Sequence, residues 1–362
     1  ERLLLIAAAT FVLWYVWLDA DRAFWVTLSV LVATCPCALS LAAPTAVTCA
    51  LASLNRRGVL IKNSAVLDVL PELSYIVFDK TGTLTEGRFS VSKVSLLDNA
   101  YSEIEVMNLI ANLESYSEHP ISRAFQCYLN QPLSLADITI SIGAGISGRY
   151  NRQLIKVGSA DFCQLPQGDA MVYLTIDDQA IAAVTLQDAL RTEVPDLLNT
   201  LRKSGYKLMM LTGDSSIQAD QLQQQLQFDT MVKGCSPEQK VAEINQLVAA
   251  GHKVMMLGDG INDSPSFHAA HVSVTLETGS DLSKNQADVV LLQPSIRLLS
   301  ELLQSSVNAQ RIIKQNLRWS VGYNLLIIPL AVAGFVSPYI AVLGMSFSSL
   351  LVVSNSLRLL KK

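Results

Sequence analysis

Long apolar segments lie at both ends of this chain of 362 residues, whereas the middle alternates short apolar and polar stretches. Residues 23–54 and 319–353 contain no charged side chain, and a shorter apolar run covers 3–18. Because about 20 apolar residues cross a bilayer as a helix, we predict four membrane spans, at about 3–18, 23–53, 319–335 and 338–356. The turn of the second pair is predicted at 334–338.

Basic residues flank these spans on one side. Lys and Arg gather at the cytosolic ends of membrane helices, so we expect the long middle segment to lie in the cytosol. The first span is rich in aromatic residues and is soon followed by another, so we do not interpret it as a cleaved signal. The basic residues are Arg56, Arg57, Lys62, Arg311, Lys314, Arg318, Arg358, Lys361 and Lys362.

The middle segment has the strand-turn-helix pattern of a parallel, doubly wound α/β sheet. We expect its strands at 75–78, 207–211, 253–257, 272–275 and 289–292, and its helices at 192–204, 216–225 and 237–250. Between about 93 and 180 the pattern changes, which predicts an inserted α+β module. That module is expected to have helices at 104–113 and 121–129 and strands at 138–142, 154–157 and 171–176.

Composition agrees with a membrane protein. Half of the residues are hydrophobic and 16% are charged, below the roughly 25% of a soluble domain. The net charge of −4 argues against a nucleic-acid partner. The six cysteines are not spaced as a disulfide framework, and the scattered Cys49, Cys127, Cys163 and Cys235 are expected to be reduced thiols.

Three polar loops follow predicted strands. They begin at Asp79, Thr212 and Gly258, and ligands bind beyond the carboxyl ends of strands in open α/β sheets. We therefore expect Asp79 to be a nucleophile toward a γ-phosphate and Asp259 to be a Mg²⁺ ligand. Thr212 and Lys240 can supply a hydroxyl group and a cation to the transferring phosphoryl group.

These loops resemble the motifs of P-type ATPases. The hallmark Asp-Lys-Thr-Gly-Thr is at 79–83, Thr-Gly-Asp is at 212–214, and Gly-Asp-Gly-x-Asn-Asp-x-Pro is at 258–265. The resemblance implies a membrane α-helical bundle plus an α/β haloacid-dehalogenase-like phosphorylation domain with an inserted α+β nucleotide-binding domain. The expected division is 1–62 (helix pair), 63–92 (phosphorylation domain, first part), 93–185 (nucleotide-binding domain), 186–305 (phosphorylation domain, second part) and 306–362 (helix pair).

The resemblance also assigns roles within the phosphorylation domain. Phosphatases of the same superfamily have an acid/base Asp two residues after the nucleophile, and Thr81 takes its place here. That exchange fits a phosphoenzyme that must persist. The expected catalytic set is Asp79, Lys80, Thr81, Thr212, Gly213, Asp214, Lys240 and Asp263, with Asn262 beside it; Asp79, Thr81 and Asp259 are expected to hold Mg²⁺.

The insert resembles the ATP-binding module of heavy-metal pumps. Ser-Glu-His-Pro at 117–120 is similar to their His-Pro motif, and 143–148 is similar to their glycine-rich nucleotide loop. The resemblance implies nucleotide contacts at Glu114, Glu118, His119, Gly143, Gly145 and Gly158. Ser159 departs from the family pattern, which has Asn after the glycine.

A Cys-Pro-Cys motif at 35–37 lies inside the second apolar segment. In an unbroken helix the side chains at i and i+2 point about 200° apart, but Pro36 breaks the helix. That break could bring the two sulfur atoms together or let them serve successive sites. Thiolates favour soft ions such as Cu⁺.

The last two spans separate copper from zinc pumps within the family. Tyr323-Asn324 and the Met345 to Ser349 segment resemble the copper pumps' Tyr-Asn and Met-x-x-Ser-Ser, whereas zinc pumps would show a Lys and a membrane Asp. The resemblance therefore implies a Cu⁺ site of Cys35, Cys37, Tyr323, Asn324, Met345 and Ser349.

The sequence thus predicts ATP-driven export of Cu⁺ through an aspartyl phosphate, with ATP and Mg²⁺, from an integral protein of a bacterial inner membrane whose catalytic domains are cytosolic. A Cu⁺ donor chaperone is a possible partner beside the lipid bilayer. The open alternatives are a Zn²⁺/Cd²⁺ pump, a membrane-anchored phosphatase and a metal sensor. The family's Thr-Gly-Glu actuator motif does not occur in the sequence, so the chain is expected to be a fragment that lacks the N-terminal region.

Overall fold

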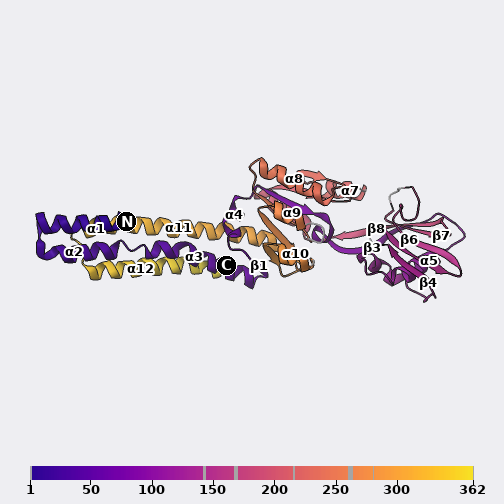
Figure 1. The fold of residues 1–362 in the computed structure, drawn as a ribbon, viewed down its shortest axis with the longest axis horizontal. Coiled ribbons are helices and arrows are strands. Elements are labelled where there is room, and N and C mark those ends of the chain that lie inside the picture. The colour runs from indigo at the N-terminus through magenta and orange to yellow at the C-terminus, as the bar shows by residue number, and fades with distance from the viewer. Residues whose placement is uncertain are drawn as a thin grey trace. The chain divides into compact units, whose positions relative to one another are not determined.

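The chain forms two units, a helical unit of Glu1–Leu73 with Ala287–Lys362 and a two-sheet unit of Ser74–Gln286. They are drawn in Figure 1 from a computed structural model. The structure describes residues 2–141, 144–166, 170–214, 217–259, 264–279 and 281–361.

The helical unit contains the apolar ends of the chain. Its long helices are α1 (Arg2–Leu13), α2 (Ala20–Ala33), α3 (Cys37–Arg56), α11 (Leu298–Val332) and α12 (Pro338–Leu357). A π-helical turn, Trp14–Leu18, extends α1, and a short strand pair, β1 (Val59–Ile61) and β13 (Val289–Leu291), runs antiparallel. The remaining pieces are α4 (Val66–Val69) and the 3₁₀ turns Leu70–Glu72 and Arg358–Leu360.

The predicted spans agree only in part with these helices. Two helical stretches of the described residues are long and apolar enough to cross a membrane, Ala20–Arg56 and Pro338–Leu360, and Leu4–Leu18 is a shorter apolar helix. The predicted span 23–53 is broken between α2 and α3, because Pro36 has no amide to continue the helix. The span predicted at 319–335 is not a separate helix but the last part of α11. The turn expected at 334–338 is present, with Gly334 at φ +77°.

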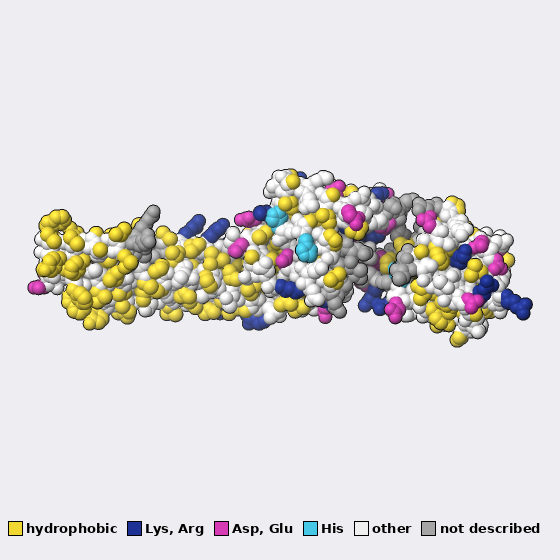
Figure 2. Space-filling model, in the orientation of Figure 1, with side chains coloured by type: hydrophobic (Ala, Val, Ile, Leu, Met, Phe, Trp, Pro, Cys, Tyr) yellow, Lys and Arg dark blue, Asp and Glu magenta, His cyan; other side chains and the backbone are white. Residues whose placement is uncertain are grey.

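Small residues let these helices approach one another. On α3, Ala38, Ala42, Ala46 and Ala50 recur every fourth residue and are all buried, so they form one face of the helix. Small interface residues are typical of membrane helices, where close backbone packing replaces the hydrophobic drive. Large apolar side chains point outward instead, including Leu325 at 76% exposure and Leu343 at 70%, and they cover the visible face of this unit in Figure 2.

The two-sheet unit contains the predicted parallel sheet. Its strands lie in the order β12, β11, β2, β9, β10 and are parallel, which confirms the expected α/β class. They are β2 (Tyr75–Asp79), β9 (Lys207–Leu211), β10 (Thr230–Val232), β11 (Val254–Leu257) and β12 (Val272–Leu276). The helices of this part are α6 (Val194–Lys203), α7 (Ile217–Leu226), α8 (Pro237–Ala249), α9 (Ser264–Ala269) and α10 (Asp281–Gln286).

The inserted module is a second, antiparallel sheet in the order β3, β8, β7, β6, β5, β4. Helix α5 (Glu103–Glu114) and a 3₁₀-helix, Pro120–Tyr128, pack on its core, which includes Ile110, Phe125 and Leu174. The strands are β3 (Thr85–Leu96), β4 (Ala136–Ser141), β5 (Gly145–Tyr150), β6 (Gln153–Gly158), β7 (Val172–Ile176) and β8 (Gln179–Leu190). The second helix predicted here is thus a 3₁₀-helix, and the two 12-residue strands β3 and β8 were not predicted.

Candidate active site

The register of the parallel sheet brings the three predicted loops together. Asp79 is the last residue of β2 and is paired with Leu211 of β9, while Phe78 is paired with Leu257 of β11. Thr212 and Asp259 therefore follow one and two residues beyond the same edge of the sheet, as ligand-binding loops do in open α/β folds.

A buried ion pair lies at the centre of this edge. The Nζ atom of Lys240 is 2.6 Å from Oδ1 of Asp79, and the two residues are only 7% and 6% exposed. Lys240 is held in the first turn of α8, whose N-terminus is fixed by Pro237 and by a reciprocal Ser236–Gln239 cap. Because both charges are out of water, each depends strongly on its partner.

The loop of Lys80–Leu84 that follows Asp79 turns sharply beside Asp259. Gly82 has φ +69°, and a Cβ atom built on it would lie 2.8 Å from Oδ2 of Asp259, so only glycine fits. Lys80 forms an ion pair with Asp214, whose amide donates to Oγ1 of Thr212 over 3.1 Å. The second loop is thereby attached to the first, while the Thr81 side chain is exposed.

Two residues of the site were not predicted from the sequence. Arg191 is buried, and its Nε and Nη2 atoms donate to the carbonyl groups of Thr83 and Gly82 over 3.0 and 3.1 Å. Asp188 accepts a hydrogen bond from Oγ1 of Thr85 over 2.5 Å. Burial raises the pKa of Asp188 and lowers the pKa of Arg191. The available signal was an Asp near the end of the apolar run 180–186 and an Arg directly after β8.

The donor set of the loop fits a hard divalent cation. Mg²⁺ prefers carboxylate and phosphate oxygens and retains waters, and Asp79 and Asp259 both lie beside the Lys80–Leu84 loop. Among the described residues no cluster of three or more His, Cys, Asp or Glu side chains is suited to a metal, so phosphate oxygens and waters would complete the shell. The predicted residues Asn262 and Asp263 lie outside the described residues.

A pocket of about 560 Å³ opens in the antiparallel sheet. Its lining includes the predicted residues Glu114, Glu118, His119, Gly145 and Gly158, and the predicted Gly143 lies outside the described residues. Glu114 is 7% exposed, and its burial raises the pKa of the carboxyl group from 4.5 to about 7.

The polar groups of this pocket are oriented by the local backbone. Nδ1 of His119 accepts a hydrogen bond from the amide of Ile121 over 3.3 Å, so in the neutral ring the proton belongs on Nε2. His119 thereby also caps the following 3₁₀-helix.

Gly145 and Gly158 are required by the packing of two strands, and the expectation that Gly145 belongs to a glycine-rich loop is corrected. Gly145 begins the strand β5 rather than a loop and is paired with Gly158 on β6. A Cβ atom on either glycine would lie 2.4 Å from a backbone oxygen, that of Val157 or Ala144. These glycines are required by the close approach of two strands, independently of any ligand.

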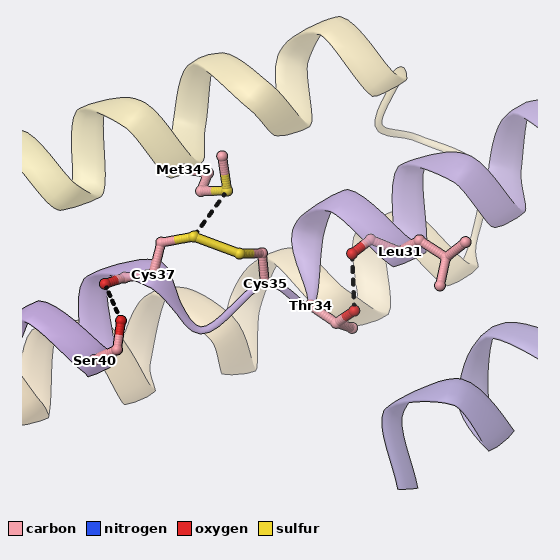
Figure 3. Close-up of a disulfide and its surroundings, with 6 residues drawn as sticks. All are labelled: Leu31, Thr34, Cys35, Cys37, Ser40 and Met345. Atoms are coloured by element: carbon pink, nitrogen blue, oxygen red, sulfur yellow. Dashed lines mark hydrogen bonds between the residues drawn. A yellow bond between two sulfur atoms is a disulfide. The ribbon is translucent and has the colours of Figure 1, made fainter. Parts of the chain in front are cut away.

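The Cys-Pro-Cys segment is unwound between α2 and α3, as Figure 3 shows. Cys35 and Cys37 form a disulfide there, where the sequence predicted two thiols, whereas Cys49, Cys127, Cys163 and Cys235 are free as expected. The physical reason is the break at Pro36, which leaves the two Cα atoms 5.5 Å apart, within the usual disulfide range. Of the two arrangements left open by the sequence, the structure has the sulfur atoms together.

A third sulfur atom faces this pair. Sδ of Met345, on α12, lies 3.7 Å from Sγ of Cys37. Tyr323 on α11 lies against α12, because a Cβ atom on Gly344 would be 2.6 Å from its Oη. Asn324 and Ser349 are half-buried on these helices, and their part in a metal site stays a prediction.

The chain is similar to known proteins along most of its length. Residues 73–271 match the haloacid dehalogenase-like hydrolases. The chain is 36% identical to the cation-transporting P-type ATPase B of Mycobacterium tuberculosis, over 94% of this chain and 48% of that protein. It is 33% identical to a copper-exporting P-type ATPase of Mycobacterium leprae, over 98% and 47%.

A solved structure extends the similarity to both units. The crystal structure of a zinc-transporting PIB-type ATPase in its E2.Pi state has a TM-score of 0.80 and 26% sequence identity, covering 99% of this chain and 62% of that one. The chain spans about half the length of the curated relatives it matches.

Proposed function

The chain belongs to the heavy-metal P-type ATPases, and on that premise we propose that it is the core of an ATP-driven pump that exports Cu⁺ from the cytosol. The observation that carries the proposal is the pairing of two sites in one chain. A buried Asp79–Lys240 pair lies among three strand-end loops, and Cys35, Cys37 and Met345 form a group of three sulfur atoms.

Asp79 is the nucleophile in this proposal. A carboxylate oxygen attacks the γ-phosphorus of ATP, the bond from that phosphorus to the β–γ bridging oxygen breaks, and ADP leaves with the electron pair. Lys240 is already 2.6 Å from Asp79, so its positive charge is in place as negative charge spreads over the phosphoryl oxygens. The hydroxyl group of Thr212 can donate to the same group.

Mg²⁺ bound by Asp79, Asp259 and the phosphate oxygens would supply the neutralising charge that in-line phosphoryl transfer requires. Thr81, two residues after the nucleophile, has no acidic group to activate water. The aspartyl phosphate is therefore expected to last until another part of the pump hydrolyses it.

The pocket of the antiparallel sheet suits the adenine of ATP. It combines apolar walls, such as Ile121 and Ile146, with polar side chains, such as Glu114 and His119, and a mixture of this kind suits a small-molecule site. His119 can direct its Nε2 hydrogen to the base, because Nδ1 is occupied by the Ile121 amide.

Cu⁺ is the proposed cargo because the group facing the helix break consists of sulfur atoms. A thioether and thiolates are soft ligands that favour Cu⁺. Zn²⁺ would be bound more tightly with a carboxylate ligand, but the sequence has no charged residue between Trp319 and Leu357. The Cys35–Cys37 disulfide must be reduced before these sulfurs can bind as thiolates. A Zn²⁺/Cd²⁺ pump is the second candidate, supported by the zinc-transporting neighbour.

The location follows from the same premise. We place the two-sheet unit in the cytosol and the apolar helices in a bacterial inner membrane, with a Cu⁺ donor chaperone as a partner.

Two measurements on the full-length protein test the proposal. Asp79→Asn should abolish acid-stable labelling from γ-labelled ATP, whereas Asp161→Asn, the same change at an exposed carboxylate, should not. Labelled phosphoenzyme in the Asp79→Asn protein would refute the mechanism. ATPase activity should rise with Cu⁺ under reducing conditions, and stimulation by Zn²⁺ but not by Cu⁺ would refute the cargo.

A further inference from the structure

A buried side-chain amide connects three helices of the helical unit. Nδ2 of Asn316, on α11, donates to the carbonyl oxygen of Ala42 on α3 over 3.3 Å and to Oγ of Ser356 on α12 over 3.0 Å. Its Oδ1 accepts from Nδ2 of Asn355 over 2.9 Å. Asn316 is 2% exposed and Ser356 is fully buried. We call Asn316 and these three partners the amide junction.

The amide junction also joins α3 and α12 directly. Oγ1 of Thr45 lies 3.0 Å from Oγ of Ser356. Both hydrogens of the Asn316 amide and its oxygen are used within the junction. The amide therefore has the role of a helix link rather than of a metal ligand.

The junction acts on the segment that carries Cys37. That segment begins after the break at Pro36 and extends to Pro44, a proline inside α3. Pro44 has no amide hydrogen, so the carbonyl group of Ser40 lacks its helical donor. Ala42 lies between the two prolines, so the Asn316 bond holds from the side a short piece of helix that is weakened at both ends.

The other two helices present the junction and the sulfur site on matching faces. Met345 and Ser356 are eleven residues apart on α12, close to three full turns, and Asn316 and Tyr323 are seven apart on α11, close to two turns. The contact of Cys37 with Met345 at 3.7 Å and the contact of Thr45 with Ser356 at 3.0 Å are thus two points of one α3–α12 seam.

We propose that Asn316 is a positioning residue for the metal site: its amide fixes the 37–43 segment of α3 against α12 and so sets the separation of the Cys37 and Met345 sulfur atoms. The metal part of this statement rests on the proposed function. The positional part does not, because it concerns two sulfur atoms of the chain itself.

The first experiment measures position without any metal. The full-length protein with Cys35→Ser and Met345→Cys is placed in lipid nanodiscs and treated with diamide, and the disulfide between Cys37 and the introduced thiol is followed by peptide mass spectrometry. Adding Asn316→Ala should slow this cross-link by roughly three- to tenfold, since interhelical hydrogen bonds in membranes are individually modest.

The control is Ser320→Ala, one turn further along α11. Ser320 is equally buried, but its hydroxyl group bonds to the carbonyl oxygen of Asn316 within the same helix rather than to a described residue of α3 or α12. It should leave the cross-linking rate within about twofold. An unchanged rate in Asn316→Ala, or an equal loss in Ser320→Ala, overturns the proposal. If Asn316→Ala does not fold, Ser356→Ala replaces it, because it removes one partner of the amide, and a smaller slowing is expected.

The second experiment measures metal binding in the unmodified cysteine background. Asn316→Ala should raise the KM for Cu⁺ in the ATPase assay by roughly three- to tenfold and leave the KM for ATP unchanged. A general loss of structure would change both. If the parent protein does not respond to Cu⁺, the proposed cargo is wrong, and the cross-linking result still decides the role of Asn316.

Discussion

Glu114 offers the sharpest quantitative test of burial in the pocket of the antiparallel sheet. Its carboxyl group is 7% exposed, and burial raises its pKa from 4.5 to about 7. Since each pKa step corresponds to about 1.4 kcal/mol, the ionised form in the folded pocket costs on the order of 3 kcal/mol. The folded state holds the proton more tightly than the unfolded state, so the stability of this module should fall as pH rises from about 4.5 to 7 and stay low above it.

Glu114→Gln removes this dependence in the full chain. Gln has nearly the same shape and never ionises, so the variant should be more stable than the parent at pH 8, by up to about 3 kcal/mol, and should match it near pH 4.5. The measurement is hydrogen exchange of the α5 amides, corrected for the pH dependence of the chemical rate, because local opening is meaningful in a chain of several units. Glu118→Gln, at an exposed position of the same pocket, is the matched control. It should leave the protection of the α5 amides unchanged both near pH 4.5 and at pH 8.

The outcome that refutes this reasoning is specific. If the α5 amides of the parent protein are equally protected from hydrogen exchange at pH 5 and pH 8, burial does not raise the free energy of the ionised Glu114 side chain. If Glu114→Gln lowers protection at pH 8, the ionised group has a stabilising partner in the folded state that outweighs desolvation.

Three further predictions concern the other sites. Arg191→Met removes the side-chain donor to the carbonyl groups of Gly82 and Thr83, so phosphoenzyme formation, measured by quench-flow labelling, should fall at least about tenfold. Nucleotide affinity, measured by equilibrium binding, should stay within about twofold. Equal losses in both would contradict a role confined to the loop. Gly344→Ala places a Cβ atom 2.6 Å from Oη of Tyr323, so it should destabilise the helical unit by about 1–3 kcal/mol, and Tyr323→Phe should restore the melting temperature if that contact is the cause. Cu⁺ binding at Cys35 and Cys37 should require a reductant, because a disulfide offers no thiolate; equal binding by the oxidised protein, measured by equilibrium dialysis, would exclude thiolate ligation.

The parallel sheet and its loops could be predicted because the information is local. Apolar runs such as 75–78 and 207–211 are followed at once by polar loops, and parallel strands must end at one edge of a sheet. The observed register of Asp79 with Leu211 follows from that rule. The inserted module was harder, since β3 and β8 mix polar and apolar residues and pair across many intervening residues.

The Cys-Pro-Cys segment shows where sequence reasoning leaves alternatives. Pro36 predicts a break in the helix but not the direction in which the chain continues. Sulfur atoms that meet and sulfur atoms that serve separate sites were both compatible with the motif. In the structure the break leaves the two Cα atoms 5.5 Å apart and the sulfur atoms together. The approach of Met345 on α12 to within 3.7 Å of Cys37 has no local signal, because the two residues lie far apart in sequence.

Arg191 explains why the conformation of the loop after Asp79 could not be predicted from the residues of that loop alone. A buried Arg is costly unless its donors are satisfied, and a sequence does not distinguish it from the more common exposed one. In the fold, Arg191 and Asp188 come from the end of β8, and Thr85 begins β3, the strand paired with it. Arg191 donates to the carbonyl groups of Gly82 and Thr83, and the hydroxyl oxygen of Thr85, which donates to Asp188, accepts a hydrogen bond from the amide of Gly82. The loop after Asp79 is therefore held from two sides, by the parallel sheet that ends in Asp79 and by the antiparallel sheet whose other strands line the pocket proposed for ATP. A substitution at the end of β8 should for that reason alter phosphorylation without touching either ATP or Asp79.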